Sequence, residues 1–190
     1  SSLREGHSIW IAEREGRAKD GDDRVEEAVL KMISLYGRSL KQDFSTYMSS
    51  LNIVPVSITY EYDPADLSKA RELKERDENN GQYQKGELED IESIIGGIKG
   101  YKGRVSVVAG DPITSGFSSP QELAQLIDSF IWQNYELYPS IMIASGKDST
   151  VKTEDKDKFM ARINAYPEEL RSRVLAMYAK PYENRNSLNN

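Results

Sequence analysis

Short runs rich in β-branched residues alternate with long amphipathic stretches, and this alternation constrains the fold of the 190-residue chain more than any other feature. The runs lie at residues 8–12, 53–60 and 104–110 and have the composition of strands. Between them, apolar residues recur at steps of three and four, which indicates helices. Strands separated by helices predict an α/β fold with a mixed, mostly parallel sheet flanked by helices.

The same pattern predicts how the chain is organised. We expect the strands in residues 1–115, interrupted by a charged helical excursion at 64–100, and a helical C-terminal extension at 116–190 packed on the same domain. The first helix is predicted to run from Asp22 or Asp23 to residue 48, because the apolar spacing continues that far. A strand-like run so near the N-terminus leads us to expect a piece of a longer protein.

Composition excludes several classes of function. The chain has 25 basic and 31 acidic residues, a net charge of −6 and a pI near 5.0, which argues against a nucleic-acid partner. No run approaches the roughly 18 apolar residues of a membrane-spanning helix. The absence of cysteine excludes disulfides, thiolate metal sites and cysteine nucleophiles, and one histidine excludes a multi-histidine zinc site. We therefore expect neither a metal nor another cofactor.

One loop carries residues suited to a ligand. Arg14, Arg17 and Lys19 lie in a glycine-containing loop between the first strand-like run and the first helix. Ligands collect at the carboxyl ends of strands in open α/β sheets, and arginine matches the oxygens of a phosphate. The loop therefore predicts a phosphate-bearing ligand, with an ordinary solvated basic loop as the alternative. The three aspartates that follow, at positions 20, 22 and 23, suit helix capping better than metal binding, because their spacing is not that of a calcium loop.

Three segments resemble conserved blocks of the glycerolipid acyltransferases, the superfamily of glycerol-3-phosphate and 1-acylglycerol-3-phosphate acyltransferases. Residues 9–21 resemble the third block, a hydrophobic strand followed by Glu-Gly and an arginine. Arg17 directly follows Gly16, one position earlier than the arginine of the family's block. Residues 53–58 resemble the fourth block, which centres on a proline-valine or proline-isoleucine pair. Residues 103–113 resemble a later strand that commonly ends in Gly-Glu-Pro-Ile. The chain thus resembles the C-terminal half of an acyltransferase domain.

The resemblance implies a role in phospholipid biosynthesis. Such an enzyme moves an acyl group from acyl-CoA or acyl-ACP to a glycerol-phosphate-type acceptor, and works in the cytoplasm, associated peripherally with a membrane. The residues implied in substrate binding are Arg14, Glu15, Gly16, Arg17, Lys19, Pro55 and Val56.

The catalytic element of the family is missing from this chain. The family uses a His-x-x-x-x-Asp block, whereas the residue five positions after His7 is Ala12. His7 is therefore expected to be exposed or structural. No catalytic residue is assigned here, and the chain alone is expected to be inactive. The alternative is a non-catalytic module that binds a phosphate ligand or a partner on an acyltransferase-like scaffold.

Overall fold

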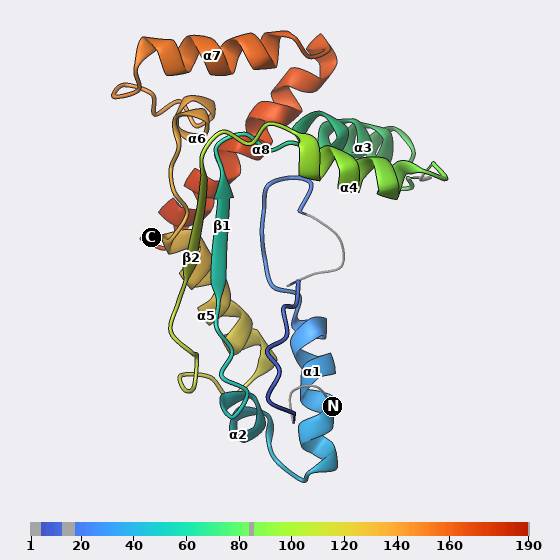
Figure 1. The fold of residues 1–190 in the computed structure, drawn as a ribbon, viewed down its shortest axis with the longest axis vertical. Coiled ribbons are helices and arrows are strands. Elements are labelled where there is room, and N and C mark those ends of the chain that lie inside the picture. The colour runs from blue at the N-terminus through green and yellow to red at the C-terminus, as the bar shows by residue number, and fades with distance from the viewer. Residues whose placement is uncertain (1–4, 13–17, 84–85, 190) are drawn as a thin grey trace. The chain divides into compact units, whose positions relative to one another are not determined.

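The computed structural model of the chain describes residues 5–12, 18–83 and 86–189 (Figure 1). This part of the chain is mostly helical and contains one small sheet. Its strands are β1 (Val56–Tyr60) and β2 (Val105–Ala109). Its helices are α1 (Glu27–Ser39), α2 (Phe44–Ser49), α3 (Asp66–Glu78), α4 (Glu89–Lys99), α5 (Pro120–Gln133), α6 (Pro139–Ala144), α7 (Thr153–Asn164) and α8 (Glu168–Ser187).

The sheet consists of β1 and β2 alone, paired antiparallel from Val56 opposite Ala109 to Tyr60 opposite Val105. Pro55 has no N–H to donate, and it lies just before β1, where its carbonyl accepts from the Gly110 N–H at 2.9 Å. The connection between the strands contains α3 and α4. The excursion leaves the C-terminal end of β1 and returns to the same end. The strand β2 therefore starts there and runs antiparallel to β1.

The predicted mostly parallel sheet is therefore wrong, although the mixture of helices and strands is present. Residues 8–12 form no strand, and Ile9, Trp10 and Ile11 are all exposed. A strand needs a neighbour to satisfy its backbone hydrogen bonds, and β-propensity does not supply one. Residues 138–144, which suit either a short strand or a connection, instead contain the helix α6, with Pro139 at its first position.

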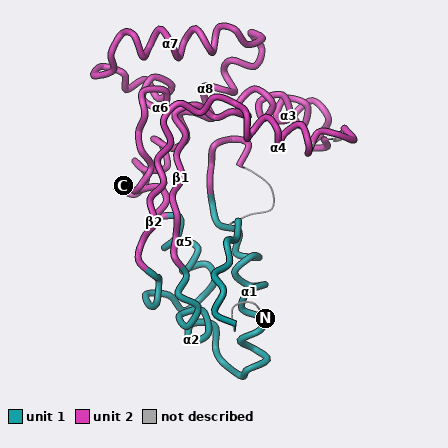
Figure 2. Tube along the Cα trace, viewed as in Figure 1, with its two compact units in different colours: residues 1–17, 24–53, 112–128 teal, residues 18–23, 54–111, 129–190 magenta. Residues whose placement is uncertain are grey.

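The described residues divide into two compact units (Figure 2). Unit 1 is drawn from segments 1–17, 24–53 and 112–128, and unit 2 from segments 18–23, 54–111 and 129–190. Each unit collects segments far apart in the sequence. The boundary expected at residue 115 remains a prediction.

Unit 1 contains α1 and α2, where the sequence predicted one long helix. The chain turns between them at Lys41, whose φ is +57°, and Asp43 then begins α2 by accepting from the Thr46 N–H at 2.9 Å. Gly37 allows the two helices to approach closely, since a Cβ there would lie 2.4 Å from Cγ of Tyr47. The amphipathic spacing of apolar residues therefore continues from α1 into α2, although the helix itself is interrupted between them.

Unit 2 has its core where α3, α7 and α8 meet. The cluster combines aromatic and aliphatic side chains, and the rings of Phe159 and Tyr178 meet edge to face with centroids 5.1 Å apart. The break between α7 and α8 falls at Pro167. Of the helices in the described residues, none has the length and apolar character that crossing a membrane requires.

Candidate functional site

The predicted phosphate loop is only partly described. Arg14, Glu15, Gly16 and Arg17 lie outside the described residues. Lys19 is described, and its ammonium forms an ion pair with the buried carboxylate of Glu72 in α3. Arg76 contacts the same carboxylate at 3.3 Å. A phosphate bound at Lys19 would therefore have to share or displace an existing anion.

Pro55 and Val56, the other predicted site residues, lie at the start of β1 and are buried and half-buried. Lys19 instead pairs with α3, which follows the opposite end of β1. A five-residue strand is about 16 Å long. The structure therefore does not bring Lys19 together with Pro55 and Val56.

At the far end of β1, Glu61 and Arg104 form a bidentate ion pair. The Glu61 carboxylate accepts from Nε and Nη2 of Arg104, each at 3.1 Å, and from the Arg104 N–H at 2.9 Å. Burial opposes the charge of Glu61, but these bonds outweigh it and hold the pKa of the carboxyl below its usual value. The hydrogen bond with Glu61 raises the pKa of Arg104. Both charges are therefore fixed in place.

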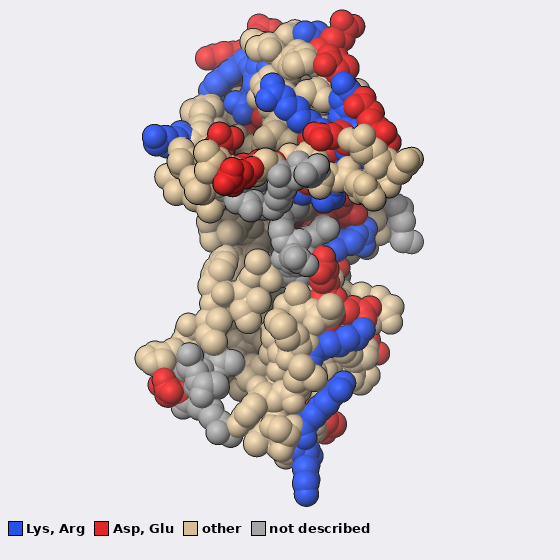
Figure 3. All heavy atoms as spheres, turned by 90° about the vertical axis from the view of Figure 1, so that its right-hand side faces the viewer, with Lys and Arg blue, Asp and Glu red and all other residues tan. Residues whose placement is uncertain are grey.

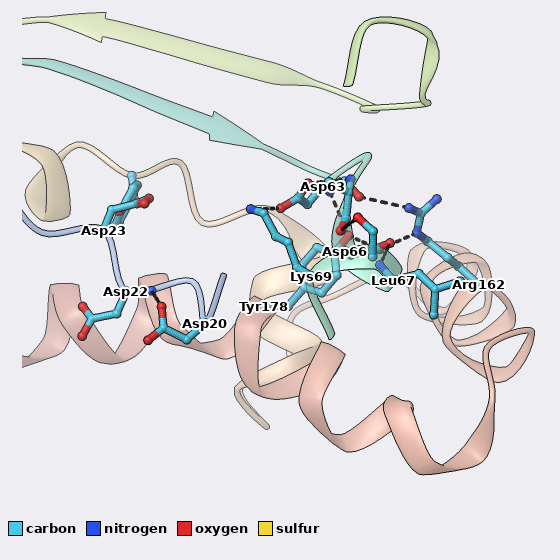
Figure 4. Close-up of polar contacts among 12 residues, drawn as sticks. Asp20, Asp22, Asp23, Asp63, Asp66, Leu67, Lys69, Arg162 and Tyr178 are labelled. Atoms are coloured by element: carbon cyan, nitrogen blue, oxygen red, sulfur yellow. Dashed lines mark hydrogen bonds and ion pairs between the residues drawn. The ribbon is translucent and has the colours of Figure 1, made fainter. Parts of the chain in front are cut away.

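The most elaborate polar cluster surrounds Asp66 at the start of α3 (Figure 4). The Asp66 side chain is buried and accepts from Arg162 Nε at 2.9 Å, the Tyr166 hydroxyl at 2.8 Å and the Tyr178 hydroxyl at 2.9 Å. It also accepts from the Leu67 N–H at 2.7 Å. Four donors match the roughly four lone-pair sites of a carboxylate. Asp66 therefore has no site left with which to accept a substrate proton.

The preceding turn extends this network. Asp63 accepts from Lys69 Nζ at 2.6 Å, and its carbonyl accepts from Arg162 Nη2 at 3.1 Å. The Asp63 N–H donates to the Tyr178 hydroxyl at 2.9 Å. The network thus ties the turn after β1 to α7 and α8.

Electrostatics keeps three members of the network, Arg162, Tyr166 and Tyr178, in one charge state. Burial and the Asp66 charge raise the pKa of both Tyr178 and Tyr166, so both hydroxyls remain donors. Burial disfavours the Arg162 charge, but the hydrogen bond and charge of Asp66 outweigh it and raise the pKa of Arg162. Groups locked in this way stabilise the fold and do not exchange protons near neutral pH.

The aspartates after the loop do not cap α1, contrary to the prediction. Asp22 accepts from Asn184 Nδ2 at 2.9 Å, and Asp23 accepts from the Tyr135 hydroxyl at 3.0 Å. The helix α1 begins only at Glu27, and no side-chain bond caps it. Across the described ranges, no cluster of acidic residues and histidine is arranged to hold a metal ion. These aspartates instead anchor residues 18–23 to α8 and to the segment between α5 and α6.

His7 is exposed, and its Nε2 lies 3.8 Å from a Glu5 carboxylate oxygen. This agrees with the expectation that His7 is exposed or structural. The sequence did not single out Asp63, Asp66, Arg162 or Tyr178. The only local signal was the Asp-Pro-x-Asp turn at 63–66, because Arg162 and Tyr178 lie about 100 residues away.

Comparisons of the chain with models of protein families, with curated proteins and with solved structures found no match in any of the three. The acyltransferase resemblance thus rests on the three sequence segments.

Proposed function

We propose that this chain is the acceptor-binding part of a glycerolipid acyltransferase. The observation that carries the proposal is the order of three segments: Glu15-Gly16-Arg17, then Pro55-Val56 within 53–58, then residues 103–113. Support also comes from the sheet, because the second segment overlaps the start of β1, the third contains β2, and the two strands pair as neighbours. Their ends meet where the Gly110 N–H donates to the Pro55 carbonyl.

Within this proposal the loop residues hold the acceptor phosphate. The Arg17 guanidinium presents two parallel N–H donors that match phosphate oxygens. Glu15 serves to orient an arginine, because a carboxylate and a phosphate repel each other. Arg14 and Lys19 add positive charge, and Lys19 is positioned by Glu72.

The proposed reaction is transfer of an acyl group from a thioester. The acceptor hydroxyl oxygen attacks the thioester carbonyl carbon, a general base takes the hydroxyl proton, and the thiolate leaves. His7 lacks the aspartate at the fifth following position that the family uses, so the base is expected from another part of the enzyme. A general base contributes about 10²–10⁴-fold, so this chain alone should show little turnover. We place the enzyme in the cytoplasm at a membrane surface, where its acylated product partitions.

Titration of the ¹⁵N-labelled chain with glycerol 3-phosphate tests the binding role. Arg17→Ala should weaken binding roughly ten- to a hundredfold, because it removes a charge-assisted bidentate contact of about 1.5–3 kcal/mol. It should change the free energy of unfolding by no more than about 0.5 kcal/mol, because the proposal assigns Arg17 to ligand binding and not to packing. Arg38→Ala, at the exposed end of α1, is the matched control and should leave binding unchanged. A large loss of stability with unchanged affinity would show that Arg17 is structural.

An acylation assay separates the transferase from the alternative binding module. Robust turnover of acyl-CoA and glycerol 3-phosphate by this chain alone would contradict the need for an outside base. A longer protein that carries the His-x-x-x-x-Asp block should acylate the acceptor. Phosphate-ligand binding without acylation by that protein would favour the binding module.

A further inference from the structure

The helix α4 exposes a continuous apolar face. Its members recur at helical spacing, and each is between 45% and 74% exposed: Leu88, Ile91, Ile94, Ile95 and Ile98. None of the described side chains of α4 is buried. An aliphatic stripe of this kind ordinarily faces a core or a partner.

The C-terminal end of α4 packs against other residues of unit 2. A Cβ at Gly100 would lie 2.5 Å from Cβ of Pro64, and the Tyr62 N–H donates to the Lys102 carbonyl at 3.0 Å. Lys102 Nζ also donates to the Ile98 carbonyl at 3.1 Å, which ties down the last turn. The apolar face is therefore presented by an anchored helix rather than by a loose segment.

The size of this face suits an interface between two copies. The five side chains expose on the order of 600 Å² on each helix, so a pair would bury at most about 1,200 Å², the lower end of specific interfaces. Interfaces of this size include weak and transient ones, so the dimer is sought at micromolar concentrations.

Charge decides how two such helices would pair. Residues 87–92 contain four acidic residues and no basic one, whereas residues 99–104 contain three basic residues and no acidic one. In this second group Arg104 pairs with Glu61 and Lys102 donates to backbone carbonyls, so the exposed Lys99 carries the charge argument. An antiparallel pair sets the acidic end of each helix against the basic end of the other, and it also opposes the helix dipoles. A parallel pair would set acid against acid. In Figure 3, acidic and basic side chains are intermingled over the upper part of the view.

We propose that the chain forms a two-fold symmetric dimer through antiparallel pairing of α4. In this register Leu88 faces Ile98 of the second copy, and Ile91 faces Ile95. The spacing 88, 91, 95, 98 is that of an a/d seam, and such an interface is self-complementary. The dimer does not depend on the acyltransferase proposal.

Sedimentation velocity of the full 190-residue chain between about 1 and 200 µM tests the dimer, given the size of the interface. The mass should rise from 21.5 kDa toward twice that value. Ile98→Asp should abolish the rise, and its far-ultraviolet spectrum reports whether the chain still folds. Met32→Asp is the matched control, because Met32 is a similarly exposed apolar residue on α1. Lys99→Glu should weaken the dimer about three- to tenfold, since it reverses two symmetric charge pairs.

Cross-linking tests the orientation, since the chain has no cysteine. An oxidised mixture of Leu88→Cys and Ile98→Cys chains should give a mixed dimer, while each variant alone should give little. Efficient Leu88→Cys self-cross-linking would overturn the antiparallel arrangement. A chain that stays monomeric at the highest concentration, or an Ile98→Asp variant that still dimerises, would overturn the dimer. A monomer that floats with phosphatidylcholine vesicles unless Ile98 is changed would assign the face to lipid instead.

Discussion

Replacing Asp66 with asparagine tests whether the buried network holds unit 2 together. The carboxylate accepts four hydrogen bonds, one of them from the charged Arg162. Asparagine has nearly the same shape, but its amide nitrogen cannot accept, so at least one buried donor loses its partner. Arg162 also loses its counter-charge while its side chain is only 25% exposed.

The expected loss follows from these contacts. Removing one partner of a buried ion pair costs about 3–5 kcal/mol. Because water reaches part of Arg162, we expect the lower end, about 3 kcal/mol. For a chain of this length each kcal/mol shifts the melting temperature by about 2–4 °C, so Asp66→Asn should lower it by about 6–12 °C. Calorimetry or thermal unfolding followed by circular dichroism measures this shift.

An exposed ion pair provides the control. Lys31 Nζ lies 2.8 Å from a Glu27 carboxylate oxygen, one turn apart on α1, and both side chains are roughly half exposed. Glu27→Gln should change stability by less than about 0.5 kcal/mol. If Asp66→Asn shifted the melting temperature no more than Glu27→Gln, the network would be incidental and the argument from burial would fail.

Three further predictions follow from single contacts. Gly103→Ala should destabilise the chain by about 1–3 kcal/mol, because φ there is +62° and a Cβ would lie 2.6 Å from Oε2 of Glu61. Gly96→Ala, in the exposed interior of α4, should instead stabilise the chain by about 0.5–1 kcal/mol. Urea unfolding measures both changes. The folded pKa of Tyr178 lies above its usual value of 10.0, so its contribution to stability is present below pH 10 and is lost as the pH rises above it. Absorbance at 295 nm should show Tyr178 ionising only with unfolding, and Tyr178→Phe should remove that change; ionisation in the folded chain near pH 10 would contradict its burial. The folded pKa of Glu61 lies below its usual value of 4.5, so the contribution of Glu61 to stability is present above pH 4.5 and is lost as the pH falls further. In unfolding titrations, Glu61→Gln should lose less stability in acid than the parent chain does. An equal loss of stability in acid would mean that the ion pair with Arg104 contributes nothing.

Several features followed from the sequence because they depend on neighbouring residues. Pro55 lacks an N–H, which suits a strand start or an edge, and it lies just before β1. The Ser-Pro-x-Glu pattern at 119–122 is a helix-start signal, and α5 begins at Pro120, with the Glu122 N–H donating to Ser119 Oγ at 3.2 Å. Pro167 interrupts a helical pattern, and it lies between α7 and α8. Helix starts and stops depend on side chains within about one turn, which the sequence shows directly.

Only the tertiary structure decided the direction of the strands and the partners of the charges. The run at 8–12 has strand composition but pairs with no strand in the described part of the chain, and β1 pairs with β2 across an excursion that reverses the chain. Lys19 was predicted for a phosphate, yet it pairs with Glu72, 53 residues away. Asp66 is satisfied by residues 96 to 112 positions further along. Strand propensity and charge are local properties, whereas pairing and neutralisation depend on which distant segments pack together.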